Sequence, residues 1–234
     1  MTTFDDKLIH FGFTLGLNTM DLATVHYNPI GENPDFVLPP DNTWFPGEDP
    51  ITSDQSVRAD VAGVIPGFTV GIVSSLRLSR DLNLRFLPGL SFGERILTFN
   101  EIVVDVNTGT FSNSTYDYSI KSTYLDFPLL IKYKARRINN NRPYVIFGGA
   151  YRQDISRTGR EDLVKLNNGG FYAELGAGWD HYFTFFRFSV EAKVSLGLNN
   201  QLGAPPSGNN QRQYYSQAFK SLRSNIFTLC FHFE

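Results

Sequence analysis

The sequence predicts an all-β protein: an eight-stranded antiparallel up-and-down barrel that forms a single domain over residues 1–234. Three observations support this prediction. Eight segments alternate between apolar residues and small or polar ones, which is the pattern of strands with two unlike faces. The connections between these segments alternate between long and short. The apolar side chains are also too many to be enclosed by a barrel of this size.

The first segment, residues 8–18, shows the alternation most clearly. Its odd positions hold bulky apolar side chains and its even positions hold small or polar ones: Ile9, Phe11, Phe13, Leu15 and Leu17 against His10, Gly12, Thr14, Gly16 and Asn18. A period of two residues places the two sets on opposite faces of one strand.

The next three segments cover residues 66–78, 82–93 and 118–134. Each repeats the period of two, with glycine, serine or charged residues facing the apolar ones. Their apolar faces are Phe68, Val70, Ile72, Leu76 and Leu78; Leu82, Leu84, Phe86, Leu90 and Phe92; and Leu125, Phe127, Leu129, Ile131 and Tyr133.

The last four segments cover residues 143–152, 170–180, 186–198 and 224–233. They complete an even number of strands, as an up-and-down barrel requires. Their apolar faces are Val145, Phe147 and Tyr151; Phe171, Ala173, Leu175, Ala177 and Trp179; Phe186, Phe188, Val190, Ala192, Val194, Leu196 and Leu198; and Phe227, Leu229, Phe231 and Phe233.

The connections fall into two classes. The long ones are rich in Pro, Asn, Gly, Asp and Ser and cover residues 19–63, 94–117, 153–168 and 199–223. The short ones cover residues 79–81, 135–142 and 181–184. This alternation predicts four long outer loops at one end of the barrel and both termini at the other end.

The volume of the apolar side chains decides which face points outward. Roughly forty of them share one face, whereas an eight-stranded barrel encloses only a few layers of side chains or one small ligand. The apolar face is therefore predicted to lie outside, in contact with hydrocarbon. Strands of about 9–11 tilted residues match the thickness of a bilayer. This argument rejects a soluble, lipid-carrying barrel with its faces reversed.

The polar face would then line a narrow interior, where charges must pair or be solvated. We predict a lumen polar network of Arg77, Arg85, Asp126, Lys132, Glu174, Arg187, Glu191 and Lys193. The hairpin of the sixth and seventh segments would set Glu174 near either Glu191 or Lys193, depending on its register. So small a lumen favours a packed structural network over an open pore.

Aromatic residues gather at the end with the short connections, as in an interfacial girdle. We expect this girdle to contain Tyr133, Trp179, Tyr182 and Phe183. The last segment ends in the alternating stretch FTLCFHF, which is similar to the C-terminal signal read by the outer-membrane assembly machinery, although Glu234 follows the final aromatic residue.

The bulk composition excludes several classes of protein. A net charge of −2 argues against a nucleic-acid partner. The single Cys230 excludes a disulfide framework and a cysteine-rich zinc site. No run approaches the roughly 18 apolar residues of a membrane-spanning helix. The start MTTFDD lacks the features of a signal peptide, so we expect either a cytoplasmic chain or, in our preferred interpretation, a mature outer-membrane chain without its leader.

Three stretches carry a family resemblance: HFGFTLGLNTMDL (residues 10–22), PGFTVGIVSSLRLSRDLNLRFLPGLSFGERILTF (66–99) and STYLDFPLLIKYKARRINNNRPYVIFGGAYR (122–152). Together they resemble the PorT family of Bacteroidetes outer-membrane proteins, called SprT in gliding species. YLDFPLLIKYK alone marks the broader superfamily of outer-membrane barrels. Joined to PGLSFGERILTF and NTMD, it is more specific to PorT.

The resemblance implies an accessory component of the type IX secretion system, which in some species also supports gliding motility. It carries over no enzymatic residues. The implied partners are outer-membrane lipids or lipopolysaccharide and proteins of the type IX translocon. The alternatives are a small structural or adhesive outer-membrane barrel without a secretion role and, third, an enzyme that modifies lipid A.

The residues themselves predict no catalytic, cofactor-binding or metal site. No His–Ser or Asp–His pair falls at the outer end of a strand, where chemistry on lipid A would occur. The acidic residues of the first long connection lack the spacing of a calcium loop. Trp44 and Phe45 in that connection indicate a surface for a protein partner. The basic turn over residues 134–142 could dock an acidic partner, although a solvated turn is the preferred interpretation.

Overall fold

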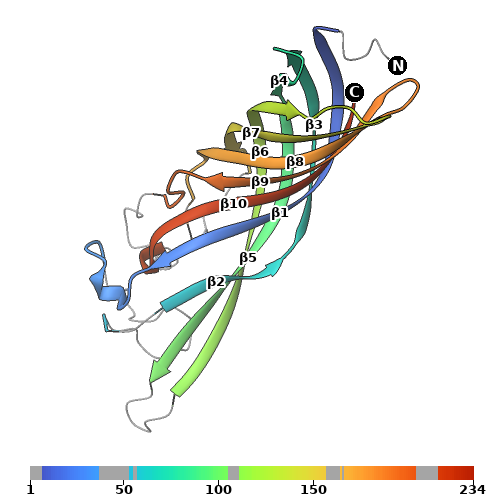
Figure 1. Ribbon diagram of the computed structural model, residues 1–234. Coiled ribbons are helices and arrows are strands. Elements are labelled where there is room, and N and C mark those ends of the chain that lie inside the picture. Colours follow the sequence, from blue (N-terminus) through green and yellow to red (C-terminus); the bar gives the residue numbers. More distant parts are fainter. Residues whose placement is uncertain are drawn as a thin grey trace.

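The computed structural model describes residues 7–36, 53–54, 57–104, 111–156, 164, 166–203 and 216–234. These residues form one β-sheet and short 3-10 turns (Figure 1). The elements are β1 (Ile9–His26), η2 (Ile30–Glu32), β2 (Val57–Val64), β3 (Pro66–Arg77), β4 (Leu82–Phe86), β5 (Gly89–Val104), β6 (Phe111–Lys134), β7 (Asn141–Asp154), β8 (Gly169–Tyr182), β9 (Arg187–Gly197) and β10 (Phe219–Phe233). None of the described helical segments is long and apolar enough to cross a membrane.

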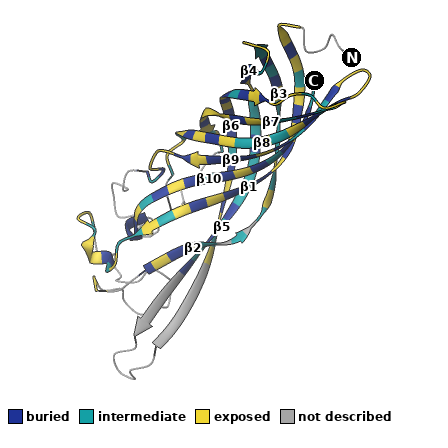
Figure 2. Ribbon diagram, in the orientation of Figure 1, coloured by how far each residue is buried: buried dark blue, intermediate teal, exposed yellow. Residues whose placement is uncertain are grey.

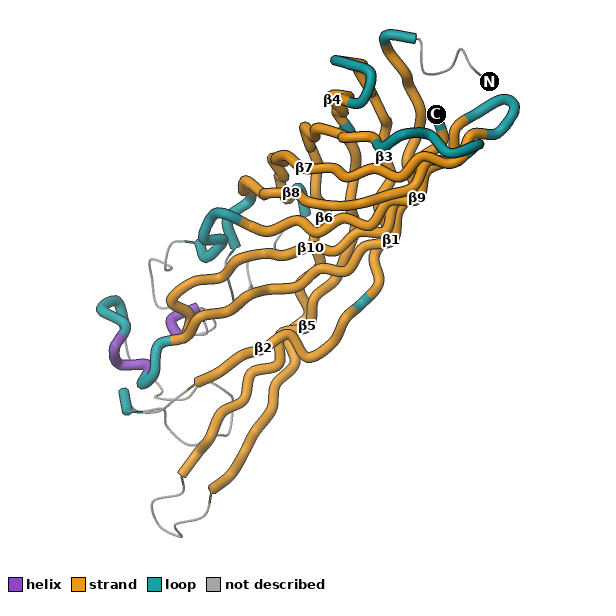
Figure 3. The backbone as a smooth tube through the Cα atoms, viewed as in Figure 1, coloured by secondary structure: helices purple, strands orange, loops and turns teal. Residues whose placement is uncertain are grey.

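The sheet closes on itself as an antiparallel ring. β1 pairs with β10 on one side and with β3 on the other, so that Leu15 lies opposite both Phe231 and Val70. Two positions in the ring are each shared by two strands. Only Ile65 separates β2 from β3, and only Leu87 and Pro88 separate β4 from β5 (Figure 3). The ten described strands thus occupy a ring of eight, which confirms the predicted eight-stranded antiparallel barrel.

The break between β4 and β5 follows from proline chemistry. Pro88 has no N–H to donate to a neighbouring strand, so the ladder cannot continue through it. The backbone groups around the break still find partners: Ile72 N–H donates to the Pro88 carbonyl at 2.9 Å, and Leu87 N–H donates to the Pro128 carbonyl at 3.2 Å. The wall of the barrel therefore stays closed where its ladder is interrupted.

The two ends of the barrel differ in their connections. β1 starts and β10 ends at the same end of the ring, together with the turns β3–β4, β6–β7 and β8–β9 (Figure 1). We call this the short-turn end and the opposite one the outer end. This arrangement is the one expected from the alternation of long and short connections.

Exposed apolar side chains form a band on the outside of the barrel next to the short-turn end. Figure 2 shows exposed and buried residues alternating along the strands there. Phe11 is 69% exposed and Leu175 is 67% exposed, which is unusual for such residues in water. This apolar band consists of Phe11, Phe13, Leu15, Leu17, Phe68, Ile72, Phe127, Leu129, Tyr133, Val145, Phe147, Phe171, Leu175, Trp179, Val194, Leu196 and Phe227. These outward orientations are the ones that the alternation predicted.

Beyond the apolar band, toward the outer end, the polarity of the two faces reverses. On β6 the outward positions change from Phe127 to Lys121, Ser119 and Asp117, which are exposed. On β1 the outward positions after Leu17 are the partly buried Thr19 and the exposed Asp21. The outside of this half is therefore suited to water, whereas the outside of the band is suited to hydrocarbon.

The inside of the outer half changes in the opposite sense and is filled by an apolar cluster. This outer core consists of Leu22, Ile30, Val57, Ala59, Leu97, Phe99, Ile120, Val164, Ala218, Phe219 and Leu222, all buried. It draws on β1, β2, β5, β6 and β10 and on segments that lie over the outer end. In chemistry it resembles the core of a water-soluble domain.

The reversal explains why several strands run further than the sequence pattern predicted. β1 continues to His26 instead of ending at residue 18, and β5 and β6 extend into residues 94–117, which were expected to be a loop. On β5 the apolar positions change from the even Leu90 and Phe92 to the odd Leu97 and Phe99. The prediction required apolar residues at positions of one parity throughout a strand. It therefore ended each strand where the apolar residues change parity, although the strand itself continues.

Candidate functional site

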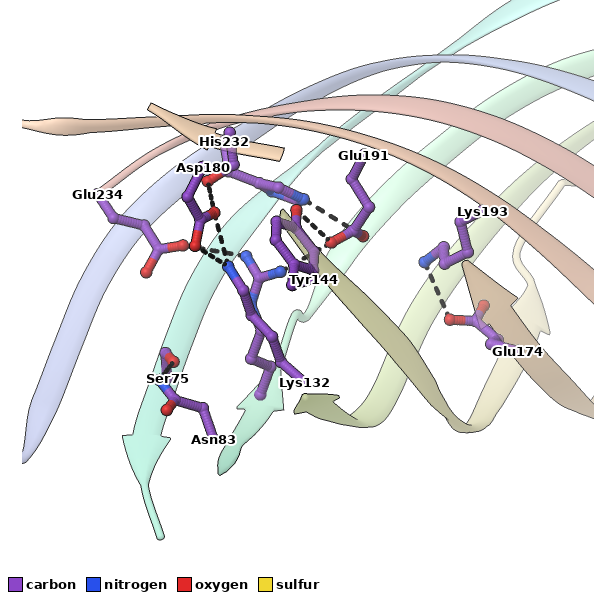
Figure 4. Close-up of polar contacts among 12 residues, drawn as sticks. Ser75, Asn83, Lys132, Tyr144, Glu174, Asp180, Glu191, Lys193, His232 and Glu234 are labelled. Atoms are coloured by element: carbon purple, nitrogen blue, oxygen red, sulfur yellow. Dashed lines mark hydrogen bonds and ion pairs between the residues drawn. The ribbon is translucent and has the colours of Figure 1, made fainter. Parts of the chain in front are cut away.

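The buried charges of the interior are the most distinctive feature of the described chain. Seven of the eight residues predicted for the lumen polar network are buried: Arg85 on β4, Asp126 and Lys132 on β6, Glu174 on β8, and Arg187, Glu191 and Lys193 on β9. Arg77, the last residue of β3, is only partly buried. Most of the buried charges lie in two clusters, and Figure 4 shows labelled members of both.

The first cluster, which we call the rim cluster, lies next to the short-turn end. It places the cations Arg85, Lys132 and Arg187 against the carboxylates Asp180, Glu191 and Glu234. Arg85 bridges two of them, because Nη1 lies 2.8 Å from Glu191 Oε2 and Nη2 lies 3.0 Å from Glu234 Oε1. Three positive and three negative groups make this cluster neutral.

Lys132 and Glu234 complete the rim cluster. Lys132 Nζ donates to Asp180 Oδ1 at 2.7 Å and to Oδ2 at 2.8 Å, and it lies 3.5 Å from the ring centre of Tyr144. Glu234 also pairs with Arg187, whose backbone exchanges two hydrogen bonds with the backbone of Glu234. Charge-assisted contacts of this kind fix side-chain positions as well as contributing energy.

The second cluster, the middle cluster, lies closer to the outer end. Arg152 Nε donates to Asp126 Oδ1 at 2.9 Å, and Arg152 Nη2 donates to Glu174 Oε1 at 2.6 Å. Lys193 Nζ lies 2.9 Å from Glu174 Oε2. Ser195 stands directly opposite Glu174 in the ladder. Lys193 is the next inward residue on β9 and Glu191 the one after it, so the register brings Lys193, and not Glu191, next to Glu174. Two cations face two carboxylates, so this cluster is also neutral.

Arg95 is a buried cation whose side chain contacts neutral groups in place of a carboxylate. It is fully buried above the middle cluster, where Nη2 donates to Ser122 Oγ at 3.1 Å and to Tyr124 Oη at 2.5 Å. Nη1 donates to Ser224 Oγ at 3.2 Å. Neutral acceptors and the aromatic face of Tyr124 thus solvate this guanidinium in place of a counter-ion.

The sequence pattern alone did not assign three members of these clusters to the network: Arg152, Asp180 and Glu234. Arg152 and Asp180 stand on the polar faces of their segments, so strand parity could have included them. Glu234 follows the last aromatic residue and looked like an exception to a terminal signal. Its even position continues the inward face of His232.

The interior is packed along its length. Among the largest side chains that are less than 2% exposed are Arg85, Arg95, Arg187, Tyr124, Tyr172, Phe99 and Lys132, which belong to every layer from the short-turn end to the outer core. A cavity of about 20 Å³ next to Asp126, Arg152, Lys193, Cys230 and His232 has room for about one water molecule. Such an interior can hold fixed charges and a water molecule or an ion, and it offers no passage to a folded protein.

The aromatic girdle is present in part. Tyr133 is 53% exposed, Trp179 is 52% exposed and Phe183 is 44% exposed, all near the short-turn end. The prediction for Tyr182 is wrong, because this residue is buried inside the barrel. It stands at an even position of β8, on the inward face with Asp180, and the Arg137 guanidinium lies 4.1 Å from the centre of its ring.

Trp44 and Phe45, the predicted partner-contact residues, lie outside the described residues.

Comparison with known proteins places the chain among outer-membrane barrels. A family model described as "Outer membrane protein beta-barrel domain" matches residues 4–203. No curated protein gives a match to the sequence.

Three solved structures from Pseudomonas aeruginosa are similar to the chain at low levels. The outer membrane protein OprG has 10% identity and a TM-score of 0.39, covering 96% of this chain and 91% of that one. The N-terminal β-barrel domain of OprF has 12% identity and a TM-score of 0.32, covering 94% and 96%. A FadL homologue has 8% identity and a TM-score of 0.29, covering 96% and 90%. These scores are too low to support an argument about function.

Proposed function

The chain belongs to the outer membrane protein β-barrel domain family, and on that premise we propose that it is a non-catalytic accessory component of the type IX protein secretion system. Its location is the outer membrane. The finer assignment is supported by the three stretches over residues 10–22, 66–99 and 122–152, which resemble the PorT family. In this proposal its partners are proteins of the translocon and the surrounding outer-membrane lipids or lipopolysaccharide.

The observation that carries the proposal is the packed interior. Because Arg85, Lys132 and Arg187 are fully buried in the rim cluster and Leu97 and Phe99 in the outer core, the barrel has no room for an exported protein. A role in secretion must then be exercised through surfaces that contact another component. Two such surfaces are proposed: the outer connection that holds Trp44 and Phe45, and the basic turn with the exposed Arg136 at the short-turn end.

Deletion of the gene tests the proposal directly. Secreted cargo that carries the C-terminal sorting domain should accumulate inside the cells, and the wild-type gene should restore its export. Unchanged export in the deletion strain would reject the secretion role and favour a structural or adhesive barrel. Mass spectrometry of lipid A from the same strain tests the enzymatic alternative, which an altered profile would support.

Complementation with surface variants then identifies the end that contacts the translocon. The pair W44A and F45A changes the outer end, and R136E changes the short-turn end. F171L, which changes only a lipid-facing side chain, is the matched control. Loss of export with normal barrel levels in one of the first two variants identifies the docking end. Full export in both variants would reject both surfaces.

A further inference from the structure

Three side chains capable of binding a metal ion meet inside the barrel, between β9 and β10. Glu191, Cys230 and His232 each offer one ligand atom, and these atoms lie within 4.8 Å of one another. Cys230 stands directly opposite Glu191 in the ladder, and His232 is the next inward residue on β10. All three are at most 4% exposed. The strand pairing therefore holds the three groups together on a rigid part of the wall, and Figure 4 shows His232 beside Glu191.

The donor atoms of this group are only partly used. Glu191 Oε2 accepts hydrogen bonds from Arg85 Nη1 at 2.8 Å and from Tyr144 Oη at 2.9 Å. The other oxygen, Oε1, has an ion-pair contact with Nε2 of His232, and Nδ1 of His232 makes no hydrogen bond with the described residues. Nε2 of His232 and Oε1 of Glu191 face each other at 3.3 Å. A buried ring nitrogen without a hydrogen bond, such as Nδ1 of His232, is costly, and the contact between Nε2 and Oε1 leaves both atoms able to turn to a further partner.

The set of donors indicates the class of that partner. An imidazole nitrogen, a thiolate sulfur and a carboxylate oxygen together suit a borderline ion such as Zn²⁺, whereas Mg²⁺ and Ca²⁺ prefer oxygen alone. Bond lengths of about 2.0–2.3 Å require donors roughly 3.3–3.8 Å apart in a tetrahedral site. The gap between Nε2 and Oε1 already has this size, and Cys230 needs only a change of side-chain position. The adjacent cavity of about 20 Å³, lined by Cys230 and His232, has space for a water molecule as the fourth ligand.

We propose that Glu191, Cys230 and His232 bind one zinc-class divalent ion inside the barrel. Binding releases the thiol proton of Cys230 to solvent, so that the sulfur coordinates as a thiolate. The ion and the thiolate together add one positive charge to a rim cluster that is already neutral. Because the cluster is neutral without the ion, we expect the barrel to fold before the ion binds. This proposal does not depend on the secretion role.

Cobalt is the most informative probe, because a thiolate bound to Co²⁺ gives a charge-transfer absorption in the near ultraviolet. The untagged protein is folded in detergent micelles, freed of metal with a chelator and titrated with Co²⁺. We expect one ion per barrel and a thiolate–cobalt band that Zn²⁺ displaces. C230S should lose the band, and H232Q should weaken binding by about tenfold or more, since loss of even an outer-shell partner costs a metal site roughly 10–100-fold in affinity. T228S, which alters the neighbouring inward residue of β10, should bind as the wild type does.

Two results would overturn the proposal. One is a folded wild-type barrel that takes up no stoichiometric Co²⁺ or Zn²⁺. The other is equal binding by wild type, C230S and H232Q, which would place the ion elsewhere. Electrophoresis without boiling reports whether each variant is folded. C230S and H232Q both keep the ion pair between Arg85 and Glu191, and C230A replaces C230S if that variant does not fold.

Discussion

The two halves of the barrel interior are built from opposite chemistry. Next to the short-turn end the wall encloses ion pairs such as Arg85–Glu191 and Lys132–Asp180, and the outside is apolar. Toward the outer end the wall encloses Leu97 and Phe99, and the outside carries charges. One continuous set of strands forms both halves, so the backbone does not dictate the difference. Each face instead matches its surroundings: hydrocarbon or the lumen in one half, water or an apolar core in the other.

The halves should also respond differently to mutation. In the charged half, each group depends on a partner of opposite sign, and loss of one partner leaves another charge buried alone. In the outer core, stability depends on apolar area and close packing, and a lost side chain leaves a cavity. The following predictions test this contrast, beginning with the largest expected effect.

Arg85→Ala should be the most destabilising of these substitutions. It leaves Glu191 and Glu234 each short of a cation in a dry interior, which costs roughly 3–5 kcal/mol of unfolding free energy. Arg95→Met is the matched comparison. Arg95 has only neutral partners among the described residues, so its loss leaves no carboxylate without a counter-ion. Denaturant unfolding in lipid vesicles measures both. Equal losses would show that counter-ions do not decide the stability of this half.

Leu175→Arg should cost about 2–4 kcal/mol, because Leu175 lies 67% exposed within the apolar band and the new charge would face acyl chains. Ser119→Arg places the same side chain on an exposed outward position beyond the band and should change stability by less than about 0.5 kcal/mol. The same unfolding measurement compares the two. A small cost at Leu175 would contradict the position of the band.

Leu97→Ala should cost roughly 2–4 kcal/mol through the cavity it leaves in the outer core, where Leu97 is fully buried. We expect the damage to stay in the outer half, since the ion pairs of the rim cluster are untouched. Limited proteolysis should then cut the outer segments sooner while the apolar band remains protected. Simultaneous loss of protection in both halves would show that they unfold as one unit.

His26 should give the smallest effect, and it depends on pH. This residue ends β1 above the apolar band, and its Nε2 accepts a hydrogen bond from the Ala59 N–H at 3.0 Å. Partial burial lowers the pKa of His26 below its usual 6.5, although the Ala59 carbonyl and Asp60 oppose the shift. The unfolded chain therefore binds the proton more readily, so the contribution is present above pH 6.5 and declines as the pH falls through that value. NMR titration of the ring should show the lowered pKa, and His26→Gln should remove this part of the pH dependence.

The sequence predicted some features of this molecule well and missed others for identifiable reasons. Alternation assigned Phe11 and Leu175 to the outside and Glu174 to the inside, because strand parity is a local property. It could not choose between Glu191 and Lys193 as partner of Glu174, because register is set by pairing with another strand. The group of Glu191, Cys230 and His232 was missed for the same reason.

The missed strand ends have a different cause. The prediction assumed that the apolar residues of a strand keep the same parity along its whole length. That holds only while the outer face of the strand stays in one environment, either hydrocarbon or water. On β5 the phase reverses where the band ends, so the apolar Leu97 and Phe99 were assigned to a loop. Tyr182 shows the reverse error, because its aromatic character was given more weight than its even position on β8. A search for phase reversals would have found both the longer strands and the outer core.

The position of Glu234 has a consequence for the order of assembly. This carboxylate belongs to the end of the last strand, and it neutralises both Arg85 of β4 and Arg187 of β9. A sheet that lacks β10 therefore keeps an open edge. The guanidinium groups of Arg85 and Arg187 in that sheet also lack the carboxylate of Glu234. Pairing of the final strand closes the barrel and neutralises these buried cations in one step. An incomplete sheet, with an open edge and unpaired charges, is therefore disfavoured in the lipid.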